Sequence, residues 1–359
     1  MRPETESELS DLIRGAMSPV VVRGGGTRGV ALGAGDVLDT TGLRGVTLYE
    51  PGALTLVVRA GTGLAEVQAL LAGERQRLSF EVPDLRAILG RPGDSTIGGV
   101  VAANASGPRR VQSGACRDSL LGVRFVDGAG TVVKNGGRVM KNVTGYDLVK
   151  LMAGSHGRLG VLTEVSLRVQ AVPEAETSLV GSCSAEAGLA ALRVALGSPF
   201  DISGAAYAQA QALIRVEGMA GSVAYRVGEL RARLGGDWRV VTGAESAALW
   251  AGVRDVAPLQ GRAGSLWRLV VKQTEALGLV QRLGGEAVYD WGGGLVWLAL
   301  PGGQAEAVRA AVVGFGHATL MRAAPQDQSV PALPPEPPAV AALSTALRQR
   351  FDPRQIFAA

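Results

Sequence analysis

Three glycine-rich stretches decide the fold that we expect: VVVRGGGTRG (residues 20–29), PGDSTIGGVVAANASGPRR (residues 92–110) and KNVTGYDLVKLMAGSHGRLGVLTE (residues 141–164). Each places glycines where a backbone can come close to a ligand, because glycine has no side chain and reaches turn geometries that other residues avoid. Successive free N–H groups in such turns form a cradle for an anion. The three stretches together therefore predict one pocket for a ligand with anionic groups.

The first stretch also matches a different motif, the nicotinamide-dinucleotide fingerprint G-x-G-x-x-G, through Gly24, Gly26 and Gly29. That fingerprint requires a helix directly after the glycines and an acidic residue about 20 residues further on. Here two more glycines interrupt residues 30–36, and a new strand begins at Val37, which leaves no room for a packed crossover helix. We therefore disfavour a nicotinamide site, and an ordinary glycine turn remains the simpler alternative for this stretch alone.

The second stretch predicts a short helix over residues 98–103, capped by Thr96, whose first N–H groups stay free for phosphate or ring oxygens. Asn104 and Ser106 add hydrogen-bonding groups beside it. The alternative is a tightly packed helix and turn without a ligand. Small residues would keep the surface flat enough for a planar ring: Gly98, Gly99, Ala102, Ala103 and Ala105.

The order of these motifs resembles the vanillyl-alcohol-oxidase/PCMH family of FAD proteins. Further segments are similar to the smaller, FAD-binding subunits of glycolate oxidases: FEVPD (residues 80–84), SGPRR (106–110), RVMKNVTGYD (138–147), YDWGGGL (289–295) and RFDPRQIF (350–357). The resemblance implies an α+β chain. It would consist of a PCMH-type FAD-binding fold of two α+β subdomains, an α+β cap lobe and a C-terminal segment that returns to the first domain.

The resemblance also implies which residues contact FAD. Residues 23–27 would form the pyrophosphate loop, and the second stretch would follow the diphosphate and the ring. The implied set is Arg23, Gly24, Gly25, Gly26, Thr27, Pro92, Gly93, Thr96, Gly98, Gly99, Asn104, Ser106, Gly107, Gly114, Arg117, Gly160 and Val161.

The link between FAD and the chain is expected to be non-covalent. Some relatives carry a histidine in the first loop that bonds to the flavin, whereas this chain has Thr27 and Arg28 there. Cys116 offers a conceivable thioether, but a small buried thiol is the simpler interpretation.

The residues that would oxidise a substrate are not evident from the sequence, and we leave the catalytic residues unknown. Oxidation of a 2-hydroxy acid needs a base near pKa 7, usually histidine. The chain has only His156, expected in a structural or loop role, and His317, expected at a surface turn. Asp290 and Trp291 either line a cavity or form a hairpin turn with a packed indole.

The resemblance implies a glycolate oxidase complex that oxidises glycolate to glyoxylate. This chain would be its FAD-binding subunit, and separate chains would supply a larger FAD-dependent catalytic subunit and an iron–sulfur subunit. Two alternatives remain open. One is a stand-alone FAD-dependent oxidoreductase of a small hydroxy acid or alcohol, and the other is a scaffold subunit whose flavin is structural or lost.

Composition limits the other function classes. A net charge of +4 with only 4% aromatic residues argues against nucleic-acid binding. Two cysteines cannot hold an iron–sulfur cluster, and no Cys/His spacing predicts a metal site. No secretion signal and no apolar run of the roughly 18 residues that a membrane span needs are evident. We therefore expect a cytoplasmic chain, reaching the inner face of the membrane only through partners.

The chain divides into four parts by composition. Residues 1–173 would be the FAD-binding domain and residues 174–324 the cap, in which helices alternate with apolar strands. Residues 325–338 are rich in proline and predict an extended linker. Residues 339–359 would form the C-terminal helix and the returning tail. Within the first part, Thr62 is predicted to cap a helix over residues 64–71.

Overall fold

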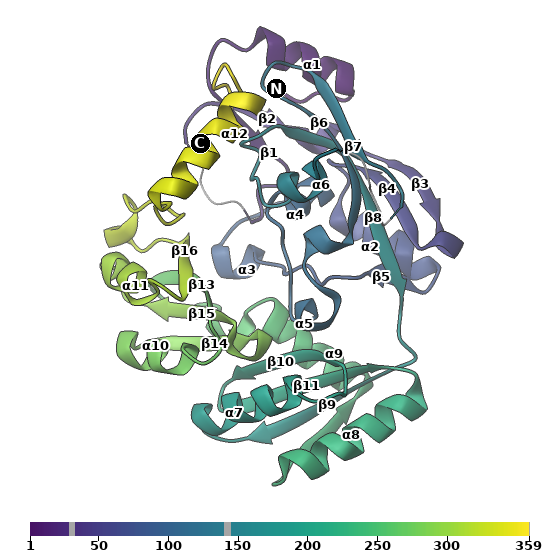
Figure 1. Ribbon diagram of the computed structural model, residues 1–359, viewed down its shortest axis with the longest axis vertical. Coiled ribbons are helices and arrows are strands. Elements are labelled where there is room, and N and C mark those ends of the chain that lie inside the picture. Colours follow the sequence, from purple (N-terminus) through teal and green to yellow (C-terminus); the bar gives the residue numbers. More distant parts are fainter. Residues whose placement is uncertain (29–32, 140–144, 359) are drawn as a thin grey trace.

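The computed structural model describes residues 1–28, 33–139 and 145–358, and its helices and strands form two lobes, each built on a sheet (Figure 1). Gly29 of the first glycine stretch and residues 141–144 of the third lie outside these ranges. Among the described residues between the first two strands none is helical, so the helix that a nicotinamide fingerprint requires does not appear there.

The first sheet is antiparallel, and its central strand β8 (Val161–Ala171) pairs on both sides. Its helices are α2 (Leu64–Gly73), α3 (Arg86–Leu89), α4 (Ile97–Ala102), α5 (Arg110–Ser113) and α6 (Leu148–Met152). The strand order is β3 (Val46–Glu50), β4 (Thr55–Arg59), β8, β6 (Leu120–Val126) and β7 (Val132–Gly136), with β5 (Gln76–Leu78) paired to the far end of β8.

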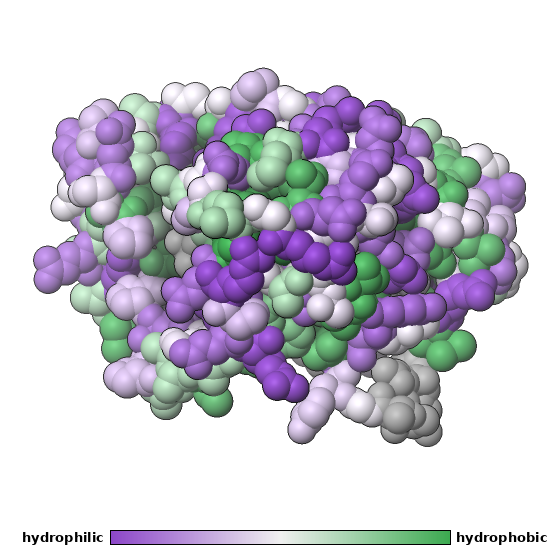
Figure 2. Space-filling view, turned by 90° about the horizontal axis from the view of Figure 1, so that it is seen from above, coloured by the Kyte–Doolittle hydropathy of each residue, from purple (hydrophilic) through white to green (hydrophobic). Residues whose placement is uncertain are grey.

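A small parallel pair, β1 (Val20–Arg23) and β2 (Asp36–Asp39), lies beside this sheet under the N-terminal helix α1 (Glu6–Gly15). The C-terminal tail returns to this pair, since Val20 bridges to Phe357 after the last helix, α12 (Pro338–Phe351). The two chain ends therefore lie at the same end of the molecule (Figure 1). Figure 2 shows the molecule from that end: the face is largely hydrophilic, and its hydrophobic residues form separate patches.

The second sheet has eight antiparallel strands and carries the helices α7 (Ala185–Leu196), α8 (Ala220–Leu234), α9 (Gly243–Arg254), α10 (Ala276–Leu283) and α11 (Ala305–Ala311). The strand order is β12 (Arg239–Thr242), β9 (Ala175–Ser182), β11 (Gln211–Gly218), β10 (Ile202–Ala208), β14 (Glu286–Asp290), β15 (Leu295–Leu300), β13 (Ser265–Val271) and β16 (Gly316–Arg322). The proline-rich segment runs along this sheet, where buried Asp327 accepts a hydrogen bond from Ser265 Oγ at 2.5 Å.

The two faces of the second sheet bury different neighbours, because successive side chains of a strand point to opposite sides. In β15, Val296, Leu298 and Leu300 pack into the core under α7, α8, α10 and α11. Leu295, Trp297 and Ala299 pack on the other face, with Ile88 and Leu89 of α3 in the first lobe. The second face therefore forms the boundary between the two lobes, and the expected α+β fold is confirmed.

Two predicted helix caps have different outcomes. Thr96 caps α4 as expected, since its Oγ1 accepts a hydrogen bond from Gly99 N at 3.2 Å. The prediction that Thr62 caps α2 is wrong, because Gly63 holds the cap position and Thr62 Oγ1 instead accepts from Gly45 N at 2.9 Å. The first N–H of the helix, that of Leu64, donates to the Ser95 carbonyl at 2.7 Å.

Candidate functional site

The first and second glycine stretches meet at the mouth of a cleft beside β1. Thr27 Oγ1 and Ser95 Oγ lie 2.9 Å apart and join the two loops. A Cβ atom on Gly25 would overlap the Asp94 carbonyl, and one on Gly24 would overlap the Thr96 hydroxyl. These two positions therefore need glycine so that the loops can approach each other.

The floor of the cleft is the start of α4, where side chains are absent or small. Gly98 faces inward, since a Cβ atom there would lie 2.8 Å from the Ala60 Cβ and carbonyl oxygen. Gly99 faces the opening, with only the Thr96 hydroxyl within reach of such an atom, at 3.2 Å. The cleft encloses about 820 Å³ of empty space including its open mouth.

The structure brings most, but not all, of the predicted site residues together. Residues 23–27 line the cleft with Thr96, Gly98, Gly99 and Gly160, and Pro92 and Gly93 line its continuation along β1. Asn104 and Ser106 line an adjoining pocket. Four predicted residues line none of these three spaces: Gly107, Gly114, Arg117 and Val161. Lining residues that the implied set did not include are Val22, Arg28, Thr40, Ala60, Ala102, Ala103, His156, Gly157 and Leu162.

Arg28 supplies positive charge to the cleft. Its Nη2 donates to Ser95 Oγ at 2.9 Å, while its Nε and Nη1 are buried without a hydrogen-bond partner among the described residues. Burial lowers the pKa of Arg28 to about 10, so the guanidinium is still protonated at pH 7. A buried polar group without a partner is costly, which points to an anionic or carbonyl group of a ligand as the missing acceptor.

His156 lies in a turn of the loop after α6, as expected, and it also lines the cleft. Its backbone N–H donates to the Ala102 carbonyl at 3.0 Å, and its φ of 54° lies in the left-handed region that non-glycine residues rarely adopt. Burial, and then the charge of Arg158, lower its pKa below the usual 6.5, so the imidazole is neutral at pH 7. His317 is exposed, as expected, but it lies in strand β16 opposite Val270 of β13 and not in a turn.

Cys116 does not reach the cleft. It is 0% exposed in the core of the first lobe, and its backbone N–H donates to Ser106 Oγ at 3.0 Å. Burial raises the pKa of its thiol well above the usual value. A buried neutral thiol is a poor nucleophile, so the interpretation of Cys116 as a packed core residue is supported.

The adjoining pocket lies between residues 103–106 and the second sheet. Three residues belong to both spaces, so the pocket opens from the cleft: Arg28, Ala103 and His156. Asp290 and Trp291 do not line it, and the packed-indole alternative is confirmed: Trp291 is 7% exposed and its Nε1 donates to the Gly107 carbonyl at 3.1 Å.

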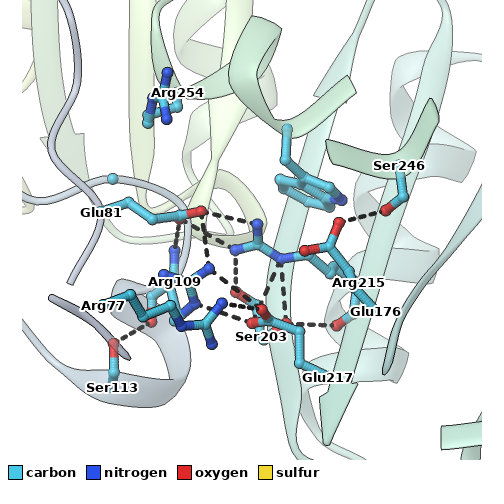
Figure 3. Close-up of polar contacts among 12 residues, drawn as sticks. Arg77, Glu81, Arg109, Ser113, Glu176, Ser203, Arg215, Glu217, Ser246 and Arg254 are labelled. Carbon is cyan, nitrogen blue, oxygen red and sulfur yellow. Dashed lines mark hydrogen bonds and ion pairs between the residues drawn. The ribbon is translucent and has the colours of Figure 1, made fainter. Parts of the chain in front are cut away.

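A buried ion-pair network joins the two lobes (Figure 3). From the first lobe, Arg77 Nη1 lies 2.6 Å from Glu217 Oε1, and Arg109 Nε lies 2.9 Å from Glu217 Oε2. From the second lobe, Arg215 Nη1 lies 2.8 Å from Glu81 Oε1. Sequence reasoning missed this network, although Arg215 and Glu217 at alternate positions of an apolar strand were a signal.

The charges in this network hold its carboxylates ionised. Burial alone would raise the pKa of Glu217, but the guanidinium groups of Arg109, Arg215 and Arg77 outweigh burial and hold the pKa well below its usual value. Glu81 also accepts a hydrogen bond from Arg109 N at 2.6 Å, so the network fixes the loop that follows Ser106.

Comparisons with known proteins agree with this geometry. A family model described as an FAD binding domain matches residues 1–136. The chain is 36% identical over 306 residues to glycolate oxidase subunit GlcE of Escherichia coli K12, which covers 84% of this chain and 82% of that protein. It is 32% identical over 189 residues to the mitochondrial D-lactate dehydrogenase [cytochrome] of Arabidopsis thaliana, covering 51% of this chain and 31% of that protein.

Two further matches are shorter or more distant. Glycolate oxidase subunit GlcD of Bacillus subtilis is 38% identical over 86 residues, covering 24% of this chain and 18% of that protein. Among solved structures, alkyldihydroxyacetonephosphate synthase superposes with a TM-score of 0.70 at 14% identity, covering 100% of this chain and 76% of that chain. At this identity the likeness concerns the fold alone.

Proposed function

This chain belongs to the family of FAD-dependent oxidoreductase subunits that includes glycolate oxidase subunit GlcE, and we propose that it is the FAD-binding subunit of a glycolate oxidase complex. The observation that carries the proposal is the similarity to GlcE over 82% of that protein's length. The complex oxidises glycolate to glyoxylate, a reaction that removes two electrons and two protons from the substrate.

The residues of the cleft fit FAD. The loops at residues 23–27 and 92–96 would hold the diphosphate. Arg28 has two nitrogens without partners among the described residues, and they would bind anionic or carbonyl oxygens of the cofactor. Gly99 leaves the surface of α4 flat for the ring. Bound FAD supplies the acceptor for the two electrons. In this proposal the FAD-binding domain is residues 1–173 and the cap is residues 174–324. Residues 325–338 are the proline-rich linker, and residues 339–359 are the C-terminal helix and the tail that returns to the FAD-binding domain.

Partner chains complete the path of the electrons. With two cysteines this chain cannot supply the four ligands that an iron–sulfur cluster usually takes. We therefore assign the cluster to an iron–sulfur subunit and the main substrate chemistry to a larger FAD-dependent subunit.

None of the helices in the described ranges is long and apolar enough to cross a bilayer. We place the complex in the cytoplasm, in contact with the inner face of the membrane through its partners.

A second candidate function is a stand-alone FAD-dependent oxidoreductase of a small hydroxy acid. The position of His156 in the cleft, with a neutral imidazole, favours it because a base is available there. Purification of a tagged chain from its native host, followed by an absorption spectrum and identification of the bound chains, separates the two. A yellow complex with two further subunits supports the proposal, and a yellow chain that purifies alone and reduces a dye with glycolate contradicts it.

A further inference from the structure

We propose that the outward face of α12, formed by Val340, Leu343, Leu347 and Arg350, is the docking surface for a partner subunit that presents an apolar groove with carboxylates at one end. The inference rests on the proposed function, since it takes this partner to be the subunit of the complex that exchanges electrons with FAD. The packing of α12, its charges and its place beside the cofactor cleft carry it.

The helix α12 connects the two lobes but packs little between its ends. Just before it, the Leu333 carbonyl accepts a hydrogen bond from Arg309 Nη2 of the second lobe at 3.2 Å. At its end, the Phe351 ring lies 6.0 Å from the Phe125 ring of the first lobe. None of its 14 residues is buried, and it lies on the outside of the molecule between β16 and β1 (Figure 1). Short helices gain most of their stability from a packed apolar face, so the packing of α12 is incomplete in the isolated chain.

An apolar stripe runs along the outward face of α12. Val340, Leu343 and Leu347 follow one another at spacings of three and four residues, so their side chains share one face of the helix. They are 46%, 67% and 38% exposed. Ala341 and Ser344, on the face that meets the protein, are half-buried. Apolar residues at positions i, i+3 and i+7 are the pattern by which a helix binds in the apolar groove of a partner.

Two arginines make one end of this stripe positive. Arg350 continues the stripe at the next helical spacing, and it forms no ion pair or hydrogen bond with a described residue. Arg348 has no such partner among the described residues either. Its charge, together with the larger effect of burial, lowers the pKa of Arg158. The C-terminal end of α12 therefore carries positive charge that a carboxylate of a partner would complement.

The acids next to α12 in the sequence are engaged elsewhere, and α12 itself contains none. Before the helix, Glu336 Oε1 accepts a hydrogen bond from Ser344 Oγ at 3.0 Å. After the helix, Asp352 is buried, and its carboxylate accepts hydrogen bonds from the backbone N–H groups of Ile356 at 2.9 Å and Phe357 at 2.8 Å. An apolar stripe that ends in unpaired positive charge fits an apolar groove that ends in carboxylates.

The inner side of α12 borders the space that leads to the cofactor cleft. Thr345 and Arg348 of α12 line a pocket together with Gly33 and Ala358. Gly33 and Ala358 also line the continuation of the cleft along β1. A partner on the outward face would therefore be separated from this space by the width of one helix, about 10–12 Å. A subunit that exchanges electrons with FAD must approach this closely, whereas a second copy of the chain or a lipid surface has no such need.

The test uses the subunits identified in the purified complex, prepared from a host that lacks this chain. They are titrated with fluorescently labelled, FAD-loaded chain. Leu343→Glu places a charge in the middle of the stripe and should weaken binding by about 10- to 100-fold, as a central interface residue would. Arg350→Glu should weaken it by about tenfold, because the carboxylates of the partner would repel it.

The helix α8 of the second lobe offers matched controls. Tyr225→Glu changes a side chain that is 64% exposed in the middle of this helix, and Arg231→Glu reverses an exposed charge in its last turn. Both should leave the affinity for the partner subunits unchanged. Flavin absorbance and circular dichroism equal to those of the wild type show that each variant is folded. If Leu343→Glu loses its flavin, Arg350→Glu alone decides.

Three outcomes would overturn the inference. The first is an equal affinity of wild type and Leu343→Glu for the partner subunits. The second is a dimer of this chain that Leu343→Glu dissociates. The third is binding to vesicles of phosphatidylglycerol and phosphatidylcholine that Leu343→Glu abolishes. In the last two cases the stripe would have a different occupant.

The same titration separates this inference from the proposed function. A complex that oxidises glycolate and binds Leu343→Glu as tightly as the wild type contradicts the inference alone. A complex whose assembly depends on Leu343 but that does not oxidise glycolate contradicts the proposed function and leaves the inference standing.

Discussion

Arg109 Nε lies 2.9 Å from Glu217 Oε2, and this contact links the loop beside the cofactor cleft to strand β11 of the second lobe. Both side chains are almost completely buried, at 6% and 3% exposed. Arg109 lies two residues after Gly107 of the predicted FAD-contacting set, while Glu217 also binds Arg77 at 2.6 Å. The position of the cleft relative to the cap therefore depends on a few buried charges.

Removing one charge of this network should destabilise the protein. Glu217→Gln removes the carboxylate that Arg77 and Arg109 contact, and it leaves Glu81 paired with Arg109 and Arg215. We expect a loss of about 3–5 kcal/mol in the free energy of unfolding, the usual cost of breaking a buried ion pair. Denaturant unfolding at pH 7 measures it. Glu245→Gln, which breaks the exposed pair with Arg239, is the control and should cost at most about 1 kcal/mol.

The same variant should change how stability depends on pH. The pKa of Glu217 is lower in the folded protein than in the unfolded chain, where it is about 4.3. Its contribution is therefore fully present above that value and is lost as the pH falls toward the folded pKa. The difference in unfolding free energy between wild type and Glu217→Gln should shrink below about pH 4. A difference that stays constant from pH 7 to pH 3 would contradict this account.

Flavin retention should depend on the open face of α4. Gly99→Trp places an indole in the cleft, because only the Thr96 hydroxyl lies near the added side chain, and we expect the purified variant to be colourless. Gly221→Trp, at an open and exposed position of α8, should retain its flavin absorbance. Full flavin occupancy in Gly99→Trp would show that FAD does not contact the open face of α4.

The sequence predicted those parts of the site that depend on the backbone. Features that depend only on a short stretch of the chain could be predicted from that stretch. They are the glycines at 24 and 25, the Thr96 cap and the small residues of α4, and the structure places them around one cleft. The Thr62 cap failed because the first N–H of α2 is satisfied by Ser95, a residue from another loop. Local propensity cannot anticipate such a partner.

The parts that sequence reasoning missed depend on tertiary contacts. Arg268 is a single charged residue in an apolar strand, and only the pairing with Trp297 and Thr319 brings it to a pocket. His156 lines the cleft from a turn in which its backbone φ is 54°, and the sequence did not predict this conformation. Arg28 was considered only as a replacement for a flavin-linking histidine, whereas its buried nitrogens face the cleft without partners among the described residues.

Arg28 should contribute directly to cofactor affinity. Arg28→Met removes the buried nitrogens that lack partners among the described residues, and we expect FAD affinity to fall by about 10- to 100-fold. Fluorescence titration of the apoprotein with FAD measures this change. Arg282→Met, at an exposed position of α10, is the matched control and should leave FAD affinity unchanged. Equal affinities in wild type and Arg28→Met would mean that this guanidinium does not bind the cofactor.

The cofactor should leave the protein on denaturation. Thr27 and Arg28 stand where some relatives carry a flavin-linking histidine, and the Cys116 thiol is fully buried away from the cleft. Acid precipitation should therefore release the yellow colour into the supernatant. Colour that stays with the precipitated protein would indicate a covalent bond, and loss of that bond in Cys116→Ser would identify its site.

The isolated, FAD-loaded chain should oxidise glycolate slowly. His156 is the histidine that lines the cleft, and no described side chain hydrogen-bonds its imidazole, so nothing described orients a ring nitrogen toward a substrate hydroxyl. Lack of an effective base typically costs about 10²- to 10⁴-fold in rate. Glycolate-dependent reduction of an artificial dye should therefore rise by at least tenfold when the partner subunits are added. Brisk reduction by this chain alone would instead favour the stand-alone oxidoreductase. In that case a fall of about 10²-fold in His156→Ala, with His317→Ala unchanged, would assign the base to His156.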